Sequence, residues 1–374
     1  MTVTKGSFIV VDLRTNILEK KYKIALVTYS LSSGGLERIV SNLSVLLGGI
    51  NTEIHIHVLN SAVDYPYSGQ LVVYALDQKK FLKKAQTYNT IKNRIKVENY
   101  DCILDHRYRL NPFTEFFWQK IIYKNEKVYN FIHSSAVYDY IFRNLKMNRW
   151  LFGSKRFIGV SEGITSIVRA AYPDLKISTL YNAVSVEASG YNPIGGKYIA
   201  TIARMDEANV KQVDVLLECF AQSMFVKMGF KLVIIGDGPR MEFMKSYARK
   251  LDIDDLVVFT GFLINPYAYL ENAYCTVLTS KYEGLPTVLI ESLMLGTPVI
   301  SFDCKTGPDE IIVPFQNGLL VENQNKQAFI KAMDSLADHT ELYHHLKTNA
   351  AKSVSKFSKE EITQQWKELL SGRY

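Results

Sequence analysis

Residues 281–298 read KYEGLPTVLIESLMLGTP, and this stretch decides how the rest of the chain is interpreted. It holds two acids, Glu283 and Glu291, with seven residues between them. Glu283 comes soon after an apolar run typical of a strand, whereas Glu291 lies within a predicted helix. Pro286 suits the first turn of that helix and Gly296 suits its end. The stretch therefore predicts a strand, a turn and a helix that carry the two acids.

The predicted start of this helix is suited to binding a phosphate. Its free backbone N–H groups and the positive end of its dipole point toward the preceding turn. Glu283 then lies on one side of the phosphate and Glu291 one turn inside the helix, so the two carboxylates accept hydrogen bonds from hydroxyls on opposite sides of a diphosphate. This arrangement predicts a nucleotide-sugar site, although either acid alone is compatible with a solvated glutamate. The predicted donor-binding residues of the turn are Gly284, Leu285, Pro286 and Thr287.

With the buried strand predicted at residues 298–302, the stretch resembles the retaining glycosyltransferases of family four, which have the GT-B fold. The resemblance implies that Glu283 faces the donor sugar and that Glu291 contacts the nucleotide ribose. It also implies an α/β architecture in which two Rossmann-like, doubly wound parallel-sheet domains face each other across a cleft.

Length and composition fit a globular protein of two domains. The chain has 374 residues, of which 47% are hydrophobic and 22% charged. Its four cysteines are widely separated, which favours a reducing cytoplasm and argues against a structural zinc site. A net charge of +7 is too small to imply a nucleic-acid partner. No apolar run has the length of a membrane span and residues 1–13 lack a signal-peptide pattern, so we expect a cytoplasmic protein or one bound peripherally at the inner face of the membrane.

Strand-like runs alternate with helical patterns, which predicts parallel sheets with ligands at the carboxyl ends of the strands. We expect an acceptor-binding domain at residues 1–184 and a donor-binding domain at residues 185–357. The resemblance implies that a helix at residues 358–374 packs back on the first domain. Strands of the first sheet are predicted at residues 22–29, 52–59, 71–75, 102–104, 128–132 and 156–160, with an extra edge strand at residues 7–11. The second sheet is predicted to open at residues 197–202.

A glycine pair, Gly34 and Gly35, follows the first of these strands and precedes a run with helical spacing. Strand, glycine turn and helix make a unit that accepts phosphate. A Gly-Gly pair alone is more simply a tight turn. Together with Glu37 and Arg38 it resembles the first loop of the family, which implies that the pair closes over the donor diphosphate.

His133 directly follows the strand predicted at residues 128–132, at an edge where ligands bind. A single histidine is often structural or exposed, which is the alternative here. The resemblance implies contact between His133 and the donor sugar or phosphate, and it does not require a general base.

Two cations follow the first strand of the second domain. The resemblance implies that Arg204 and Lys211 bind the diphosphate and neutralise charge on the leaving nucleotide; the alternative is a pair of exposed cations. Further along, the backbone of Gly261, Phe262 and Leu263 is expected to meet the nucleotide base.

Two other motifs resemble a dinucleotide site and a metal site, but neither fits fully. The turn at residues 236–239, GDGP, lacks the third glycine of a dinucleotide fingerprint because Met241 occupies that position. The acid pair Asp252 and Asp254 matches a short metal-binding motif, but its position between a helix and a strand favours a surface turn. We therefore expect no catalytic metal and no other cofactor.

Residues 79–96 are strongly basic and contain no acid. The simpler interpretation is a solvated helix face, and the alternative is electrostatic contact with an anionic membrane surface or a phosphate-bearing acceptor. The basic residues are Lys79, Lys80, Lys83, Lys84, Lys92, Arg94 and Lys96.

Taken together, the resemblance implies a retaining transferase that moves a hexose or N-acetylhexosamine from a nucleotide sugar to a hydroxyl of a glycan or lipid-linked acceptor in cell-surface polysaccharide biosynthesis. The resemblance favours UDP over GDP as the nucleotide of the donor. The expected catalytic residues are Glu283, Arg204, Lys211 and His133. A nucleotide-sugar epimerase of the same fold and a non-catalytic nucleotide-sugar binding protein are the alternatives.

Overall fold

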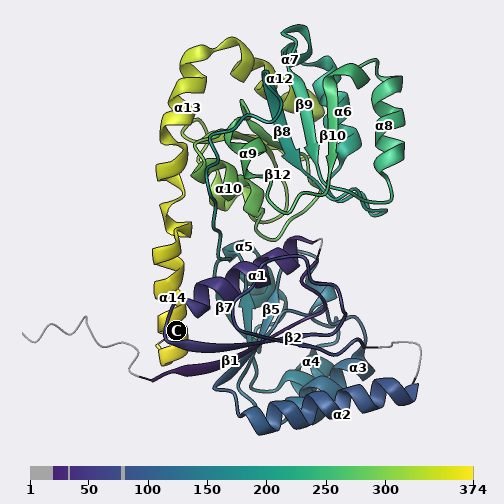
Figure 1. The fold of residues 1–374 in the computed structure, drawn as a ribbon, viewed down its shortest axis with the longest axis vertical. Coiled ribbons are helices and arrows are strands. Elements are labelled where there is room, and N and C mark those ends of the chain that lie inside the picture. The colour runs from purple at the N-terminus through teal and green to yellow at the C-terminus, as the bar shows by residue number, and fades with distance from the viewer. Residues whose placement is uncertain (1–19, 33, 77–80, 374) are drawn as a thin grey trace, which may run out of the picture.

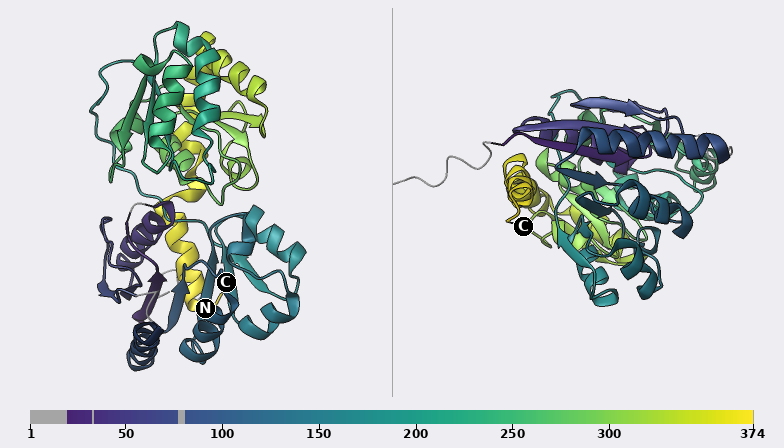
Figure 2. Two further views of the ribbon diagram at one scale, coloured as in Figure 1. Left: turned by 90° about the vertical axis from the view of Figure 1, so that its right-hand side faces the viewer. Right: turned by 90° about the horizontal axis from the view of Figure 1, so that it is seen from below.

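The computed structural model describes residues 20–32, 34–76 and 81–373. The edge strand predicted at residues 7–11 and the two lysines Lys79 and Lys80 lie outside them. The described residues form two α/β domains, which Figures 1 and 2 show stacked one on the other with the last helices running along both.

The first domain is built on a parallel sheet that has seven strands within the described residues, in the order β3-β2-β1-β4-β5-β6-β7. In β1 (Tyr22–Thr28), Ile24 and Leu26 belong to one hydrophobic cluster and Ala25 and Val27 to another. All four are buried because helices cover both faces of the sheet. The other strands are β2 (Thr52–Val58), β3 (Gln70–Val73), β4 (Cys102–Asp105), β5 (Val128–Ile132), β6 (Arg156–Gly159) and β7 (Lys176–Thr179).

The helices of this domain divide between the two faces. Helix α1 (Gly35–Gly48) and the C-terminal α14 (Lys359–Ser371) contribute to the cluster that contains Ile24, whereas α2 (Phe81–Glu98) and the π-helix η1 (Phe117–Ile122) contribute to the cluster with Ala25. The remaining helical segments are α3 (Pro112–Phe116), η2 (Val137–Asp139), α4 (Leu145–Phe152) and α5 (Glu162–Ala171).

The second domain has a parallel sheet of six strands within the described residues, in the order β10-β9-β8-β11-β12-β13. Its strands are β8 (Tyr198–Ile202), β9 (Lys231–Ile235), β10 (Val257–Gly261), β11 (Thr276–Leu278), β12 (Val299–Asp303) and β13 (Gly318–Glu322). Its helices are α6 (Val213–Gln222), α7 (Met224–Lys227), α8 (Met241–Lys250), η3 (Asp254–Leu256), α9 (Tyr267–Glu271), α10 (Thr287–Met294), α11 (Pro308–Ile311), α12 (Lys326–Asp338), α13 (Thr340–Ser353) and η4 (Ser355–Phe357).

Helix α14 lies on the first domain, although it follows the second in sequence (Figure 1). Ser358 caps it, since the Ser358 side chain accepts a hydrogen bond from the N–H of Glu361 at 3.3 Å. Trp366 stacks on Phe131 of β5 with ring centroids 6.2 Å apart. The last helix therefore ties the two domains together.

The order of the strands reverses once in each sheet, between β1 and β4 and between β8 and β11. Ligands of open α/β sheets bind at such a switch point, beyond the carboxyl ends of the strands. The loop with Gly34 follows β1, Arg204 follows β8, and Glu283 follows β11. Topology alone thus places Gly34, Arg204 and Glu283 at the switch points of their sheets.

The predicted two-domain parallel α/β fold is confirmed. Strands β7 and β13 were not predicted, and the strands that were predicted differ from the observed ones at their ends. The strand predicted at residues 71–75 ends at Val73, because Ala75 has a φ of +47° that an extended strand does not accommodate. Pro286 precedes helix α10 as its N-cap with ψ 90°, rather than lying in the first turn. Gly296 follows the helix with a φ of +80°, a conformation that favours glycine.

Candidate active site

Glu283 lies in the turn between β11 and α10, and two neighbours hold its carboxylate. Ser280 Oγ donates a hydrogen bond to Oε1 at 2.6 Å, and Lys211 Nζ forms an ion pair with the same oxygen at 2.5 Å. The side chains of Glu283 and Lys211 are 12% and 25% exposed, so solvent screens the pair only in part. Two of the predicted catalytic residues are therefore in direct contact.

The backbone of this turn is packed against the first domain. The N–H of Ser135, which follows β5, donates to the carbonyl oxygen of Glu283 at 3.0 Å. A Cβ added at Gly284 would lie only 2.0 Å from the carbonyl oxygen of His133, so no side chain fits there. From the other side, Thr306 Oγ1 donates to the Glu283 carbonyl at 2.7 Å. The turn and the loop of His133 thus form one continuous surface at the junction of the domains.

His133 is paired with a second histidine. His106 follows β4 as His133 follows the neighbouring β5, and His106 Nδ1 lies 3.0 Å from His133 Nε2. Burial lowers the pKa of His106 to about 3, and the charge of Arg109 adds to the shift. The pKa of His133 is well below its usual range because of burial, His106 and Arg109. Both rings are therefore neutral at physiological pH, and a hydrogen bond between them fixes the direction of each.

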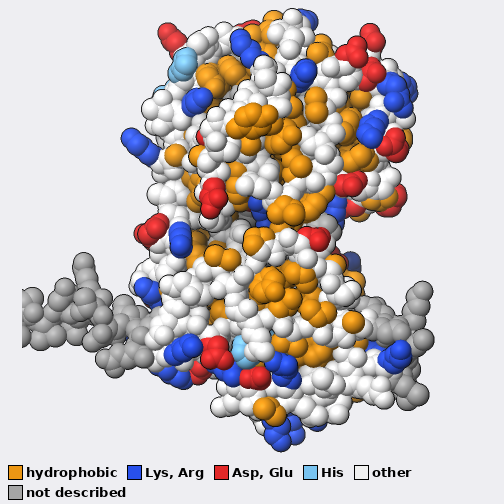
Figure 3. All heavy atoms as spheres, viewed as in Figure 1, with side chains coloured by type: hydrophobic (Ala, Val, Ile, Leu, Met, Phe, Trp, Pro, Cys, Tyr) orange, Lys and Arg blue, Asp and Glu red, His pale blue; other side chains and the backbone are white. Residues whose placement is uncertain are grey.

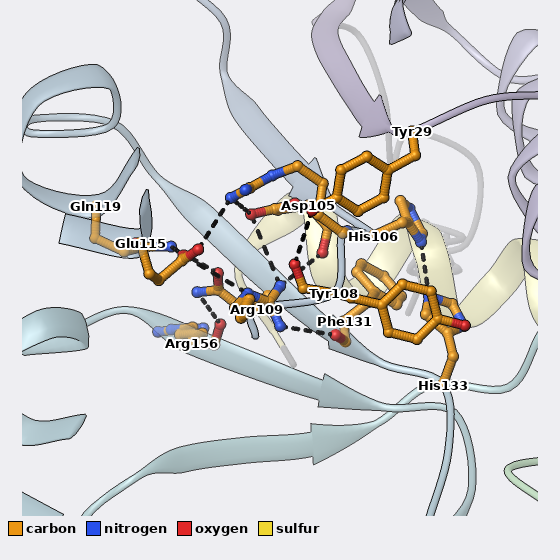
Figure 4. A network of polar contacts seen from close by, with 12 residues as sticks. Tyr29, Asp105, His106, Tyr108, Arg109, Glu115, Gln119, Phe131, His133 and Arg156 are labelled. Atoms are coloured by element: carbon orange, nitrogen blue, oxygen red, sulfur yellow. Dashed lines mark hydrogen bonds and ion pairs between the residues drawn. The ribbon is translucent and has the colours of Figure 1, made fainter. Parts of the chain in front are cut away.

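A buried network of charges supports this histidine pair (Figure 4). Arg109 donates to the carbonyl oxygens of Phe131 at 3.1 Å and Asp105 at 2.9 Å, and so joins the ends of β5 and β4. Arg107 donates to Asp105 at 2.7 Å and lies 3.5 Å from Glu115. All four charged side chains are at most 1% exposed, so each depends on its partners for stabilisation.

Arg204 lies in the loop after β8 and is paired with Asp206. Its Nε and Nη2 atoms donate hydrogen bonds to Asp206 Oδ2 at 3.1 Å and 3.0 Å. The side chain of Arg204 is 64% exposed. The GDGP turn holds this loop closely, since a Cβ at Gly236 or Gly238 would lie within 2.4 Å of a carbonyl oxygen of the loop. The structure therefore brings the Lys211 side chain and the His133 backbone to the Glu283 turn, and leaves Arg204 exposed with its own acid partner.

Glu291 lies on the buried side of α10 and is 3% exposed. Burial raises the pKa of its carboxyl, and the charge of Arg38 from the first domain opposes that rise. The guanidinium of Arg38 stacks over the ring of Tyr267 at 5.0 Å, and the Tyr267 hydroxyl donates to the carbonyl of Ser185 at 2.5 Å. The charge of a first-domain cation thus acts on the carboxylate that is predicted to contact the ribose.

The other predicted donor-binding residues lie on both sides of the same junction. Gly34 is the N-cap of α1, and the carboxylate of Glu37 folds back so closely that a Cβ at Gly34 would lie 1.9 Å from it. Gly261 ends β10 with a φ of +74°, and the ring of Phe262 meets that of Tyr65 in the first domain at 6.0 Å. Gly35, Leu263, Leu285 and Thr287 complete this set.

No group of three or more His, Cys, Asp or Glu side chains suited to a metal ion occurs among the described residues. Asp252 and Asp254 lie in an exposed turn after α8, as predicted. Within the part of the chain that the structure describes, no helix combines the length and hydrophobicity needed to cross a bilayer.

Sequence reasoning missed His106 and did not identify the contacts of Arg38. A signal for His106 was present, because it follows a strand adjacent to β5 at the same edge of the sheet. Arg38 reaches its partners only through the packing of two domains, which no local pattern predicts.

Known proteins share both the fold and part of the sequence. Residues 191–353 match the family model described as glycosyl transferases group 1. These residues, somewhat under half of the chain, are therefore similar to a group 1 domain. Over 94% of its length the chain is 25% identical to the whole of the N-acetylgalactosamine-N,N'-diacetylbacillosaminyl-diphospho-undecaprenol 4-alpha-N-acetylgalactosaminyltransferase of Campylobacter jejuni. Over 47% of its length it is 31% identical to the Lipopolysaccharide 1,6-galactosyltransferase of Escherichia coli, of which it spans about half (51%).

The group 1 domain and its partner domain also have the architecture of solved glycosyltransferases. A structure of S. aureus TarM in complex with Fondaparinux, alpha-GlcNAc-glycerol and UDP superimposes with a TM-score of 0.76 at 14% identity, covering 93% of this chain and 99% of that one. The GT-B fold predicted from the sequence is therefore confirmed. The domain match and the two named relatives support a glycosyltransferase.

Proposed function

We propose that the chain transfers a hexose or N-acetylhexosamine from a UDP-sugar to a hydroxyl of a glycan or lipid-linked acceptor, with retention of anomeric configuration and without a metal ion. In this proposal residues 185–357 bind the donor and residues 1–184 bind the acceptor. Glu283, Lys211, Arg204 and His133 carry the chemistry. The acceptor class is supported by the printed names of relatives that act on undecaprenol-linked and lipopolysaccharide substrates.

One observation carries the proposal: the Glu283–Lys211 pair of the second domain lies against the loop of His133 in the first. Ser135 hydrogen-bonds the backbone of Glu283, and only a glycine fits between Glu283 and Leu285. A sugar diphosphate that reaches this turn meets an acid and a cation beside the backbone of the His133 loop. Such preorganised groups act most strongly where water is excluded. Figure 3 shows the two domains meeting at a narrow waist.

The chemistry requires positive charge more than a strong base. The bond between the anomeric carbon and the phosphate oxygen breaks, a bond from the acceptor oxygen to that carbon forms on the same face, and the acceptor proton passes to the departing phosphate. Lys211, Arg204 and the N-terminus of α10 stabilise the charge that develops on the diphosphate. Each well-placed donor of this kind contributes about 3 kcal/mol to the transition state.

Glu283 and His133 orient the sugar in this scheme. The Glu283 carboxylate accepts hydrogen bonds from sugar hydroxyls and stabilises positive charge at the anomeric carbon. Because the pKa of His133 is well below its usual range, the ring is a weak base and acts through hydrogen bonding. Glu291 accepts hydrogen bonds from the ribose hydroxyls.

A donor-panel assay tests the proposal. The purified chain is incubated with UDP-glucose, UDP-galactose, UDP-N-acetylglucosamine and GDP-mannose without acceptor, and the products are separated. Slow release of UDP and free sugar, lost in Glu283→Gln but kept in the exposed control Glu341→Gln, supports a transferase. An isomerised sugar identifies an epimerase, and binding without turnover identifies a binding protein. Activity lost with EDTA and restored with manganese contradicts the metal-free mechanism.

A further inference from the structure

The histidine pair that Figure 4 shows beyond the ends of β4 and β5 leaves two ring nitrogens without a partner. His106 Nδ1 lies 3.0 Å from His133 Nε2, whereas His106 Nε2 and His133 Nδ1 are buried and form no hydrogen bond within the part of the chain that the structure describes. Both rings are neutral, so each carries one proton. The hydrogen bond between them can therefore run in two directions, and each direction leaves one N–H group unpartnered.

The two directions place this N–H group on different histidines. If His106 Nδ1 donates, both rings carry their proton on Nδ1, and the unpartnered N–H belongs to His133. If His133 Nε2 donates, both rings carry their proton on Nε2, and the unpartnered N–H belongs to His106. The direction of one hydrogen bond thus decides which histidine presents a free hydrogen-bond donor.

The surroundings of His106 disfavour an unpartnered N–H group there. His106 is 0% exposed, and its ring stacks on Phe131 with centroids 4.2 Å apart, so water does not reach it. His133 is partly exposed and belongs to the loop on which the Glu283 turn packs. In proteins, buried N–H groups that lack an acceptor are rarer than acceptors that lack a donor. Donation by His106 is therefore favoured, because it leaves the N–H group on the histidine that is partly exposed.

Backbone contacts hold the two rings at this separation. Arg109 donates to the carbonyl oxygen of Asp105 at 2.9 Å and to that of Phe131 at 3.1 Å, one residue before His106 and two before His133. Strands β4 and β5 are also paired in parallel up to these residues. A change confined to the His106 side chain should therefore leave the backbone of His133 in place.

We propose that His106 is a positioning residue whose Nδ1–H donates to His133 Nε2 and thereby keeps the His133 proton on Nδ1. His133 then offers an N–H group, which pairs with an oxygen lone pair of a phosphate or of a sugar hydroxyl. The opposite tautomer of His133 would offer a bare nitrogen, which repels a phosphate oxygen. The contact of His133 with the donor substrate rests on the proposed function, whereas the tautomers can be read without any substrate.

Long-range proton–nitrogen NMR spectra of histidine-labelled protein read the tautomers directly, because protonated and unprotonated ring nitrogens differ in chemical shift. The chain has seven histidines, so His106→Leu and His133→Gln are needed to identify the two sets of signals. Both His106 and His133 should be Nδ1–H tautomers in the wild type. Nε2–H tautomers on both rings overturn the proposal.

Substitution of His106 separates positioning from a purely structural role. His106→Leu keeps an apolar group against Phe131 but removes the donor, so an Nε2–H signal of His133 should appear and donor hydrolysis should fall about tenfold. His106→Asn keeps an amide nitrogen at the δ position and should retain most of the activity. His344→Leu is the control, since His344 is exposed on α13 of the second domain.

Two results from these variants would also overturn the proposal. One is wild-type hydrolysis in His106→Leu, and the other is a His133 proton that stays on Nδ1 in that variant. Failure of the wild type to hydrolyse any donor contradicts the proposed function instead, and the spectra then still decide the direction of the hydrogen bond.

Discussion

Replacing Gly284 by alanine adds a single methyl group and should disrupt the contact between the Glu283 turn and the His133 loop. The added Cβ would lie 2.0 Å from the carbonyl oxygen of His133, whereas real Cβ contacts are essentially never under 3.0 Å. Backbone lies on both sides of this contact, so no side chain can rotate away. The Glu283 turn and the His133 loop must therefore separate by about 1 Å.

The expected magnitude follows from that displacement. A misplacement of about 1 Å in a catalytic arrangement costs roughly a hundredfold in rate. A hundredfold loss corresponds to about 2.7 kcal/mol of transition-state stabilisation. Because the turn and not the core is moved, kcat/KM for the donor should fall far more than thermal stability.

The assay compares donor hydrolysis and Tm for the wild type, Gly284→Ala and the control Gly196→Ala. Gly196 has no neighbour within 4 Å of its added Cβ, so the control changes the same atoms without a clash. Near-normal turnover in Gly284→Ala refutes the claim that this contact aligns the site. A fall in Tm large enough to explain the lost activity refutes the claim that the effect is local.

Other variants and conditions test separate parts of the account. Arg204→Ala should lower turnover by about two orders of magnitude while Tm stays unchanged, and near-normal turnover removes Arg204 from the mechanism. The pKa values of His57 and His106 are lowered from 6.5 to about 3. Between these pH values the unfolded chain binds protons that the folded chain does not, so the stability contributed by the two histidines is fully present above pH 6.5 and is lost on acidification toward pH 3. Urea unfolding should show the free energy of unfolding falling by about 1.4 kcal/mol per pH unit for each histidine. A stability that is flat from pH 6.5 to about pH 5 contradicts this sign. The Glu310 carboxylate accepts hydrogen bonds from the N–H groups of Glu162 and Gly163 at 2.8 Å and so caps α5 across the domain junction. Glu310→Ala should lower the free energy of unfolding by about 1 kcal/mol and increase the radius of gyration in solution scattering. An unchanged radius argues against a role of Glu310 in holding the two domains together.

Much of the fold was predictable because its signals are local. Continuous apolar runs gave the buried parallel strands, and helical spacing gave α1 and the capped α14. Errors occurred where backbone conformation changes within one residue, as at Ala75 and Pro286. Such end effects depend on tertiary packing and not on propensity.

Local motifs also placed Arg204, His133 and Glu283 after the carboxyl ends of parallel strands, where ligands of such sheets bind. The partners of those residues were not predictable. The pair of His106 with His133 depends on strand order, and the approach of Arg38 to Glu291 depends on how two domains dock.

Calorimetric titration with UDP and GDP is the most direct test of the claim that the Glu283 turn and α10 bind a nucleoside diphosphate. The wild type should bind UDP, Glu291→Gln should bind it at least about tenfold more weakly because a charged hydrogen-bond acceptor is lost, and Glu341→Gln should match the wild type. A wild-type protein that binds neither nucleotide, or a Glu291→Gln variant with undiminished affinity, contradicts the account.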